Sequence, residues 1–283
     1  MRERRYLQLD VFSARPGAGN PLGVVLDADG LDGAAMQALA AWLNLSETVF
    51  FLPPDAPGAD YHIRIFTPRM ELPFAGHPSV GAAWAAVETG QATPAGGRLL
   101  QQCAAGLLPV RVGSVAQQRL VAVRSPAAQL LIATPPALPP SLATIAAGEP
   151  SLWSNGPEWW LLEVADEAAL RALQPDIAAI AALPRSGKLA AFAPADGDGY
   201  QLVLRAFAPG VGVDEDPVTG SANALVAALL QAQRRLPGRG GRYVASQGRE
   251  RGRDGLVEIR VDEDQEVWIG GLVQPVIAGS VHW

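Results

Sequence analysis

Two helix-forming segments without a polar face constrain this chain more than any other feature. Residues 79–87 read SVGAAWAAV and residues 222–230 read ANALVAALL. A helix that is apolar all round is buried all round, and neither segment reaches the ~18 apolar residues of a membrane span. We therefore expect each helix to be enclosed by protein, most simply by a curved sheet wrapped around it.

The segments that lead into these helices form an internal repeat. RIFTP (residues 64–68) resembles RAFAP (205–209), 141 residues later, and ELPFAGH (71–77) resembles EDPVTGS (215–221), 144 residues later. A strand, a loop and a buried helix thus occur twice, about half the chain apart. The repeat predicts an α+β fold of two pseudo-symmetric, barrel-like domains, residues 1–125 and 126–283, with the last strand free to return to the first domain. A proline-rich stretch, residues 134–140, is a candidate linker or edge segment.

Scarce residue types exclude several chemistries. The 283 residues include one cysteine, Cys103, three histidines and a single lysine, Lys188. These counts do not support a structural zinc site or a redox thiol pair, and they exclude a racemase built on two cysteines. A lysine nucleophile or Schiff base would need Lys188, which lies in the loop-like stretch 184–188. We therefore expect no metal site.

Net charge and hydropathy limit which binding partners and which cellular compartment we expect. With 22 basic and 28 acidic residues the net charge is −6, and no Lys/Arg run has the electrostatic footprint of a nucleic-acid binder. The basic N-terminus resembles the start of a signal peptide, but Asp10 interrupts the apolar run that follows it. We expect a soluble cytoplasmic protein that contacts neither nucleic acid nor membrane.

The two helix starts are the candidate binding site. Pro78 is predicted at position N1 of the first helix and Ser221 at the N-cap of the second. Free backbone N–H groups would then point out of both helices. If the two domains face each other, both helix N-termini converge on one cleft that suits a small carboxylate. The alternative is that these residues only cap their helices.

Three side chains near these starts are candidates for acid–base chemistry. His77 precedes the first buried helix, and Asp216 lies in the equivalent loop of the second copy. Glu47 stands just before the apolar segment 49–52, where burial would raise its pKa toward the range of a proton shuttle. Each also has a structural interpretation: a hydrogen-bonded histidine, a turn-forming aspartate before Pro217, and a surface glutamate at a strand start.

Five motifs together resemble the PhzF family of phenazine biosynthesis, which is itself similar to diaminopimelate epimerase. The motifs are NPL (20–22), NLSETVF (44–50), IFTP (65–68), ELPFAGHP (71–78) and EDPVTGSA (215–222). They follow the family's order, and the resemblance covers the chain from Gln8 to about Val273. It implies two α/β barrels that each wrap a central helix, with the active site between them, and a homodimer.

The resemblance also implies a function. A cofactor-free isomerase of this family uses the glutamate that matches Glu47 to move a proton between two carbons of a cyclohexadiene amino acid, as in trans-2,3-dihydro-3-hydroxyanthranilate isomerases. His77, Asp216 and Ser221 match active-site positions, and Gly76 and Gly220 match glycines whose backbone helps to hold the substrate.

Two departures from the family's pattern bear on this hypothesis. The epimerase relatives have a cysteine in each of the two loops, and this chain has none there, so two-cysteine racemisation is not carried over. Asn223 stands where many family members have another residue, which leaves the substrate open. We expect an isomerase of a small cyclic or amino-acid-like carboxylate; the alternatives are an amino-acid epimerase and a non-catalytic protein that binds a small carboxylate.

Overall fold

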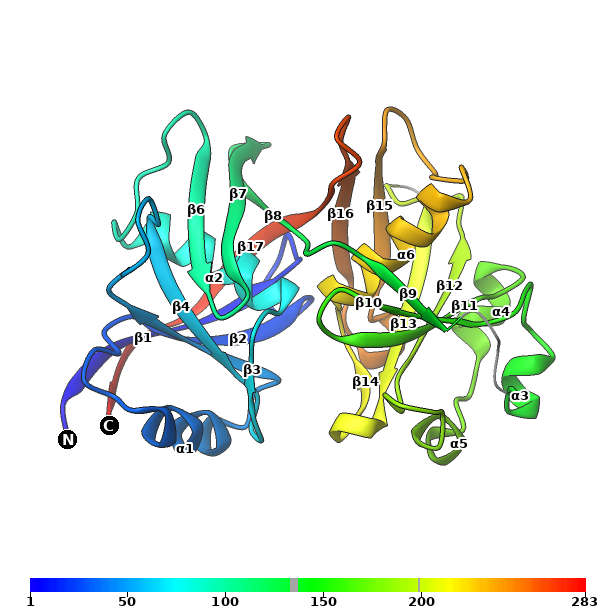
Figure 1. Cartoon of the computed structure of the whole chain (residues 1–283), viewed down its shortest axis with the longest axis horizontal. Coiled ribbons are helices and arrows are strands. Elements are labelled where there is room, and N and C mark those ends of the chain that lie inside the picture. Colours follow the sequence, from blue (N-terminus) through cyan, green and yellow to red (C-terminus); the bar gives the residue numbers. More distant parts are fainter. Residues whose placement is uncertain (133–136, 198) are drawn as a thin grey trace. The chain divides into compact units, whose positions relative to one another are not determined.

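The computed structural model describes residues 1–132, 137–197 and 199–283, and it divides into two compact units (Figure 1). Unit 1 comprises Met1–Arg124 with Gly270–Trp283, and unit 2 comprises Ser125–Ile269. Residues 134–136 of the proline-rich linker candidate lie outside the described part of the chain. Within that part, no helix is long and apolar enough to cross a membrane.

Unit 1 is a curved sheet with one helix inside it and one on its surface. Its strands are β1 (Glu3–Val11), β2 (Asn20–Val25), β3 (Glu47–Leu52), β4 (Tyr61–Phe66), β5 (Glu71–Leu72), β6 (Arg98–Cys103), β7 (Gly106–Val115), β8 (Gln118–Arg124) and the later part of β17 (Val267–His282). The last strand runs antiparallel to β1 and pairs Leu7 with Ala278. The chain's final segment therefore completes the sheet that its first segment begins.

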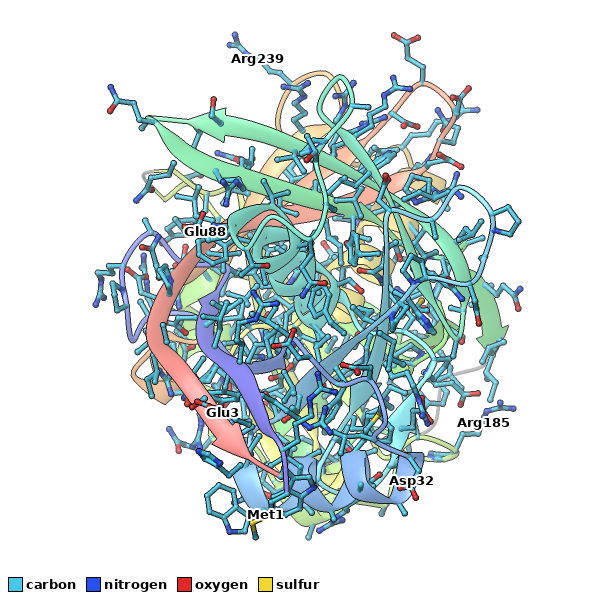
Figure 2. All side chains as sticks on the ribbon, turned by 90° about the vertical axis from the view of Figure 1, so that its left-hand side faces the viewer. Met1, Glu3, Asp32, Glu88, Arg185 and Arg239 are labelled. Carbon is cyan, nitrogen blue, oxygen red and sulfur yellow. The ribbon has the colours of Figure 1, made fainter. Side chains whose placement is uncertain are left out.

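The helix inside unit 1 is α2 (Gly76–Glu88), and every residue from Gly76 to Ala86 is buried. Strands β1, β2, β3, β4, β6 and β8 all contact it. Figure 2, which labels Glu88 at the end of α2, shows side chains filling the space between this helix and the surrounding strands. The prediction of a buried helix wrapped by a sheet is confirmed for this unit.

The surface helix of unit 1 is α1 (Gly33–Leu43), whose apolar stripe covers the sheet. Met36, Leu39 and Ala40 are buried in a cluster with Phe50 and Phe66. The side chain of Asp32 caps the helix by accepting a 2.8 Å hydrogen bond from the N–H of Ala35, and Asn44 ends it in the left-handed conformation, at φ 52°. Helix α1 is therefore bounded at each end by a residue with a local capping role.

Unit 2 has the same plan. Its strands are β9 (Gln129–Ile132), β10 (Ser151–Ser154), β11 (Glu158–Glu163), β12 (Leu189–Pro194), β13 (Leu202–Ala208), β14 (Val213–Asp216), β15 (Arg242–Gln247) and β16 (Gly255–Val261). Its helices are α3 (Pro140–Ala143), α4 (Glu167–Ala172), α5 (Ile177–Ala181) and the buried α6 (Gly220–Ala232), with two 3₁₀ turns, η1 (Pro209–Val211) and η2 (Arg249–Arg251). The α+β fold, a curved sheet around a central helix in each unit, is as predicted.

The internal repeat extends to strand register. In each unit, successive strand pairs alternate between antiparallel and parallel, beginning and ending with an antiparallel pair. The pairs are β1–β2, β2–β3, β3–β4, β4–β6 and β6–β7 in unit 1. They are β10–β11, β11–β12, β12–β13, β13–β15 and β15–β16 in unit 2. Thr48 pairs with Phe66 as Leu189 pairs with Phe207, 141 residues later. The repeat seen in the motifs is therefore a repeat of whole units.

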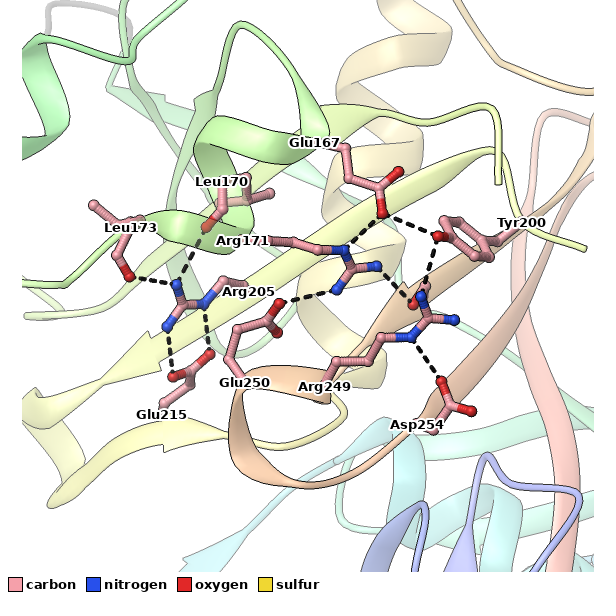
Figure 3. Close-up of polar contacts among 11 residues, drawn as sticks. Glu167, Leu170, Arg171, Leu173, Tyr200, Arg205, Glu215, Arg249, Glu250 and Asp254 are labelled. Carbon is pink, nitrogen blue, oxygen red and sulfur yellow. Dashed lines mark hydrogen bonds and ion pairs between the residues drawn. The ribbon is translucent and has the colours of Figure 1, made fainter. Parts of the chain in front are cut away.

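Polar contacts connect helix α4 of unit 2 to the sheet of that unit (Figure 3). Arg205 on β13 donates hydrogen bonds to the carbonyl oxygens of Leu170 and Leu173 at the end of α4, at 3.2 and 2.6 Å. On α4, Arg171 forms ion pairs with Glu167 and with Glu250 of η2, at 2.6 and 2.9 Å. These contacts tie the end of α4 to β13 and hold η2 against α4.

Candidate functional site

Both buried helices begin two residues earlier than predicted. The helix α2 starts at Gly76 after the N-cap residue Ala75, and α6 starts at Gly220 after Thr219. The prediction that Pro78 is N1 and Ser221 the N-cap is therefore wrong: Pro78 is the third helical residue and Ser221 the second. Since the first N–H groups of a helix have no intrahelical partner, proline fits anywhere in the first turn and does not mark its first residue.

The two helix starts share a further property. Neither Ala75 nor Thr219 caps its helix with a side-chain hydrogen bond. His77 and Ser221 both occupy the second helical position, directly after a glycine, and both are buried. The structure thus gives each unit the same arrangement, a glycine followed by a buried polar side chain in the first turn of the central helix.

In unit 1, Glu47 and His77 come together. Glu47 is the first residue of β3, and its Oε2 lies 3.5 Å from His77 Nε2. The two side chains are 17% and 5% exposed. A strand start and a helix start, 30 positions apart in the sequence, therefore bring a carboxylate against an imidazole in surroundings with little water.

The imidazole of His77 is neutral. Burial lowers its pKa from 6.5 to about 3, although a hydrogen bond to the Pro21 carbonyl opposes this shift. Asn20 Nδ2 lies 3.5 Å from His77 Nδ1, and Asn20 Oδ1 accepts a 3.0 Å hydrogen bond from Ser46 Oγ. Asn20 therefore lies toward Nδ1 and Glu47 toward Nε2, and the tautomer of the ring decides which nitrogen carries the proton.

Asn20 and Ser46 also belong to the site, although neither was predicted as a site residue from the sequence. Asn20 is fully buried at the first position of β2, and Ser46 directly precedes β3. Both lie within motifs that carry the family resemblance, NPL and NLSETVF. A polar residue repeated at the starts of two neighbouring apolar strands was the signal available in the sequence.

In unit 2, Asp216 is held at the end of β14. Its Oδ2 accepts a 2.6 Å hydrogen bond from Thr219 Oγ1. Gln247 Nε2 donates to the Asp216 carbonyl and to Thr219 Oγ1, both at 2.9 Å, and Gln247 Oε1 accepts from the Thr219 N–H at 2.9 Å. The buried amide of Asn223 joins the same network through Gln247 Oε1, at 3.2 Å. The network fixes the loop that carries Asp216 into α6.

Ser221 lies beside a buried tryptophan in the same unit. Trp159 Nε1 donates a 3.1 Å hydrogen bond to Ser221 Oγ, and Asn155 Nδ2 donates a 3.1 Å hydrogen bond to the Ser221 carbonyl. The serine hydroxyl accepts the indole's hydrogen bond, which leaves its own hydrogen to donate. Trp159 and Asn155 were not predicted from the sequence.

The predicted residues therefore form two groups. Gly76, His77 and Glu47 meet in unit 1, and Asp216, Gly220 and Ser221 lie around the start of α6 in unit 2. The prediction that both groups line one cleft stays a prediction. Among residues 1–132, 137–197 and 199–283, no group of three or more His, Cys, Asp or Glu side chains is placed to hold a metal ion.

Comparison with known proteins gives the family. The family model of phenazine biosynthesis-like proteins, PhzC-PhzF, matches residues 9–279. The chain is 36% identical over 269 residues to a trans-2,3-dihydro-3-hydroxyanthranilate isomerase of Pseudomonas aeruginosa, which covers 91% of this chain and 90% of that protein. It is 30% identical over 296 residues, 99% of both chains, to a protein of Schizosaccharomyces pombe named antisense-enhancing sequence 1.

A solved structure agrees with the fold. A phenazine biosynthesis protein of the PhzF family from Bacillus anthracis superposes with a TM-score of 0.83 over 100% of both chains, at 24% identity. The match to the family model spans both units and all five motifs described above. The chain therefore belongs to the PhzC-PhzF family of phenazine biosynthesis-like proteins.

Proposed function

We propose that this protein is a cofactor-independent isomerase that moves a proton within a small cyclic or amino-acid-like carboxylate. The observation that carries the proposal is the 3.5 Å approach of Glu47 Oε2 to a buried, neutral His77. A carboxylate in dry surroundings beside an uncharged imidazole suits repeated proton transfer. The isomerase names of relatives that match most of the chain support the same reaction class.

Glu47 is the proposed base and acid. As a carboxylate it removes a proton from one carbon of the substrate, and as a carboxylic acid it returns a proton to another carbon. A cationic imidazolium beside it would lower the pKa of Glu47 and weaken it as a base. A neutral imidazole beside the carboxylate adds no such charge.

Unit 2 supplies the proposed anchoring groups. Ser221 Oγ and the uncapped N–H groups at the start of α6 donate toward a carboxylate, and Asp216 assists proton movement. Gly220, like Gly76 in α2, lets a ligand approach the helix backbone because it has no side chain. The name of the Pseudomonas aeruginosa relative makes trans-2,3-dihydro-3-hydroxyanthranilate the first compound to test.

The test follows turnover and ligand binding in the same variant. Wild type, Glu47→Gln and the exposed control Glu263→Gln are each incubated with that compound in deuterated water and followed by proton NMR. We expect Glu47→Gln to lose at least ~100-fold in turnover, the scale of general acid–base catalysis, and the control to match wild type. Affinity for 3-hydroxyanthranilate, a stable aromatic analogue, should stay within about tenfold of wild type.

The other outcomes separate the alternatives. Turnover retained in Glu47→Gln would remove this residue from its proposed role. Deuterium entering a stereocentre with inversion and no shift of a double bond would favour an amino-acid epimerase. Binding of the analogue without any exchange would favour a non-catalytic carboxylate-binding protein. The predicted homodimer is checked separately by sedimentation equilibrium.

A further inference from the structure

Lys188, the single lysine of the chain, occupies the position in the internal repeat that corresponds to Glu47. Leu189 pairs with Phe207 as Thr48 pairs with Phe66, so Lys188 stands in unit 2 where Glu47 stands in unit 1. Glu47 is the first residue of β3, and Lys188 directly precedes β12. Each of these strands pairs in parallel with the strand before it, β3 with β2 and β12 with β11. The repeat thus replaces a carboxylate with an ammonium at the same structural position.

The Lys188 ammonium lies over the indole that contacts Ser221. Lys188 Nζ is 4.7 Å from the centroid of the Trp159 ring, and Nε1 of the same ring donates to Ser221 Oγ at 3.1 Å. A cation over an aromatic face is attracted by the ring's electron density. Trp159 therefore holds an ammonium over its face and a hydroxyl at its edge.

The carboxylates near Lys188 have other partners. The charges of Glu158 on β11 and Asp216 on β14 both act on the ammonium. Glu158, however, accepts two hydrogen bonds from Arg185, and Asp216 accepts one from Thr219. Within the described part of the chain, Lys188 Nζ has the indole face as its contact and forms neither a hydrogen bond nor an ion pair.

We propose that Lys188 and Ser221 form a carboxylate-binding site in unit 2, in which the ammonium pairs with the anion and the serine hydroxyl donates to it. The inference rests on the proposed function, because it names the side chains that hold the carboxylate of its substrate. The charge, the hydroxyl and the aromatic platform all come from unit 2. A planar ring that carries the carboxylate would gain the Trp159 indole as a neighbouring apolar surface.

The proposal has a pH signature. Burial lowers the pKa of Lys188 to about 8, although Glu158 and Asp216 oppose this shift. The ammonium, and with it the affinity for a carboxylate, is therefore present at pH 7 and lost as the pH rises through about 8. In Lys188→Arg the guanidinium stays charged over this range, so the loss should disappear.

The experiment compares two probes that differ by one charge, 3-hydroxyanthranilate and its neutral amide. Binding of each is measured by calorimetry at pH 7 to wild type, Lys188→Met, Lys188→Arg and a control that removes an exposed cation, Arg239→Met. We expect Lys188→Met to weaken binding of the carboxylate at least tenfold and of the amide less than twofold. Lys188→Arg should stay within about threefold of wild type, and the control should change neither probe.

Each outcome decides between the proposals. Equal weakening of both probes in Lys188→Met, or no weakening, overturns the role of Lys188 and leaves the proposed function standing. If neither probe binds wild type, the proposed function fails together with the inference. If Lys188→Met does not fold, wild type and Lys188→Arg still decide, because only wild type should lose carboxylate affinity between pH 7 and pH 9.5.

Discussion

Arg205 holds both carboxylate oxygens of Glu215, with Nε–Oε1 and Nη2–Oε2 distances of 2.9 and 3.0 Å (Figure 3). The two side chains are 5% and 8% exposed. The equivalent pair of unit 1, Arg64 and Glu71, has the same bidentate geometry at 2.7 Å, but its side chains are 28% and 35% exposed. The repeat therefore contains one ion pair in two environments.

Because the two pairs differ in burial, we expect the same substitution to lower the free energy of unfolding by different amounts in the two units. Glu215→Gln leaves a buried guanidinium without its counterion and should lower the free energy of unfolding by about 3–5 kcal/mol. Glu71→Gln, at the exposed pair, should cost below about 1 kcal/mol. Urea denaturation of both variants checks this, and equal losses would contradict the role given to burial.

The neutral state of His77 predicts an acid-sensitive fold. Its pKa is about 3 in the folded protein and 6.5 as an ordinary histidine, so between these values the unfolded chain binds a proton that the folded chain does not. Stability due to this group is therefore complete above pH 6.5 and lost as the pH falls toward 3, by about 1.4 kcal/mol per pH unit. His77→Gln should remove this slope, as measured by urea denaturation between pH 7 and pH 4. The control His282→Gln, at an exposed position, should keep it.

Asn20 is predicted to position the proton of His77. An amide NH₂ that donates to Nδ1 favours the tautomer with the ring proton on Nε2, toward Glu47. In Asn20→Asp, a carboxylate oxygen replaces this NH₂, which draws the ring proton to Nδ1 and leaves Nε2 bare. We expect kcat to fall at least tenfold with KM changed less than about threefold. The ¹⁵N chemical shifts of the His77 ring should exchange between the two nitrogens. Unchanged shifts would show that Asn20 does not set the tautomer.

Gly81 sets the approach of α2 to the sheet. A Cβ at this position would overlap Leu22 Cδ2 and lie 3.0 Å from Val11 Cγ2. Gly81→Ala should therefore lower the free energy of unfolding by about 1–3 kcal/mol despite the better helix propensity of alanine. The double variant with Leu22→Val, which removes the overlapping methyl group, should cost less than the sum of the two single variants. Gly113→Ala, whose Cβ would meet no atom within 4 Å, is the control, and a similar loss there would contradict this account.

The sequence alone determined the plan of each unit. Helices without a polar face had to be enclosed, and the motifs around RIFTP and RAFAP placed the same strand and loop before each of them. The sequence also indicates where α1 begins and ends, because Asp32 and Asn44 are residue types that commonly cap helices. These features depend on neighbouring residues or on periodicity along the chain, and both can be identified in the amino-acid sequence.

The tertiary structure decided which polar side chains meet. Glu47 and His77 were candidates for separate reasons, and only the register of β3 beside β2 and α2 brought them within 3.5 Å. Trp159 and the position of Lys188 over its indole had no signal in the spacing of residues along the sequence. Contacts between residues far apart in sequence depend on strand pairing and on how closely a helix can approach its sheet. Those are properties of the packed chain, and periodicity along the sequence does not contain them.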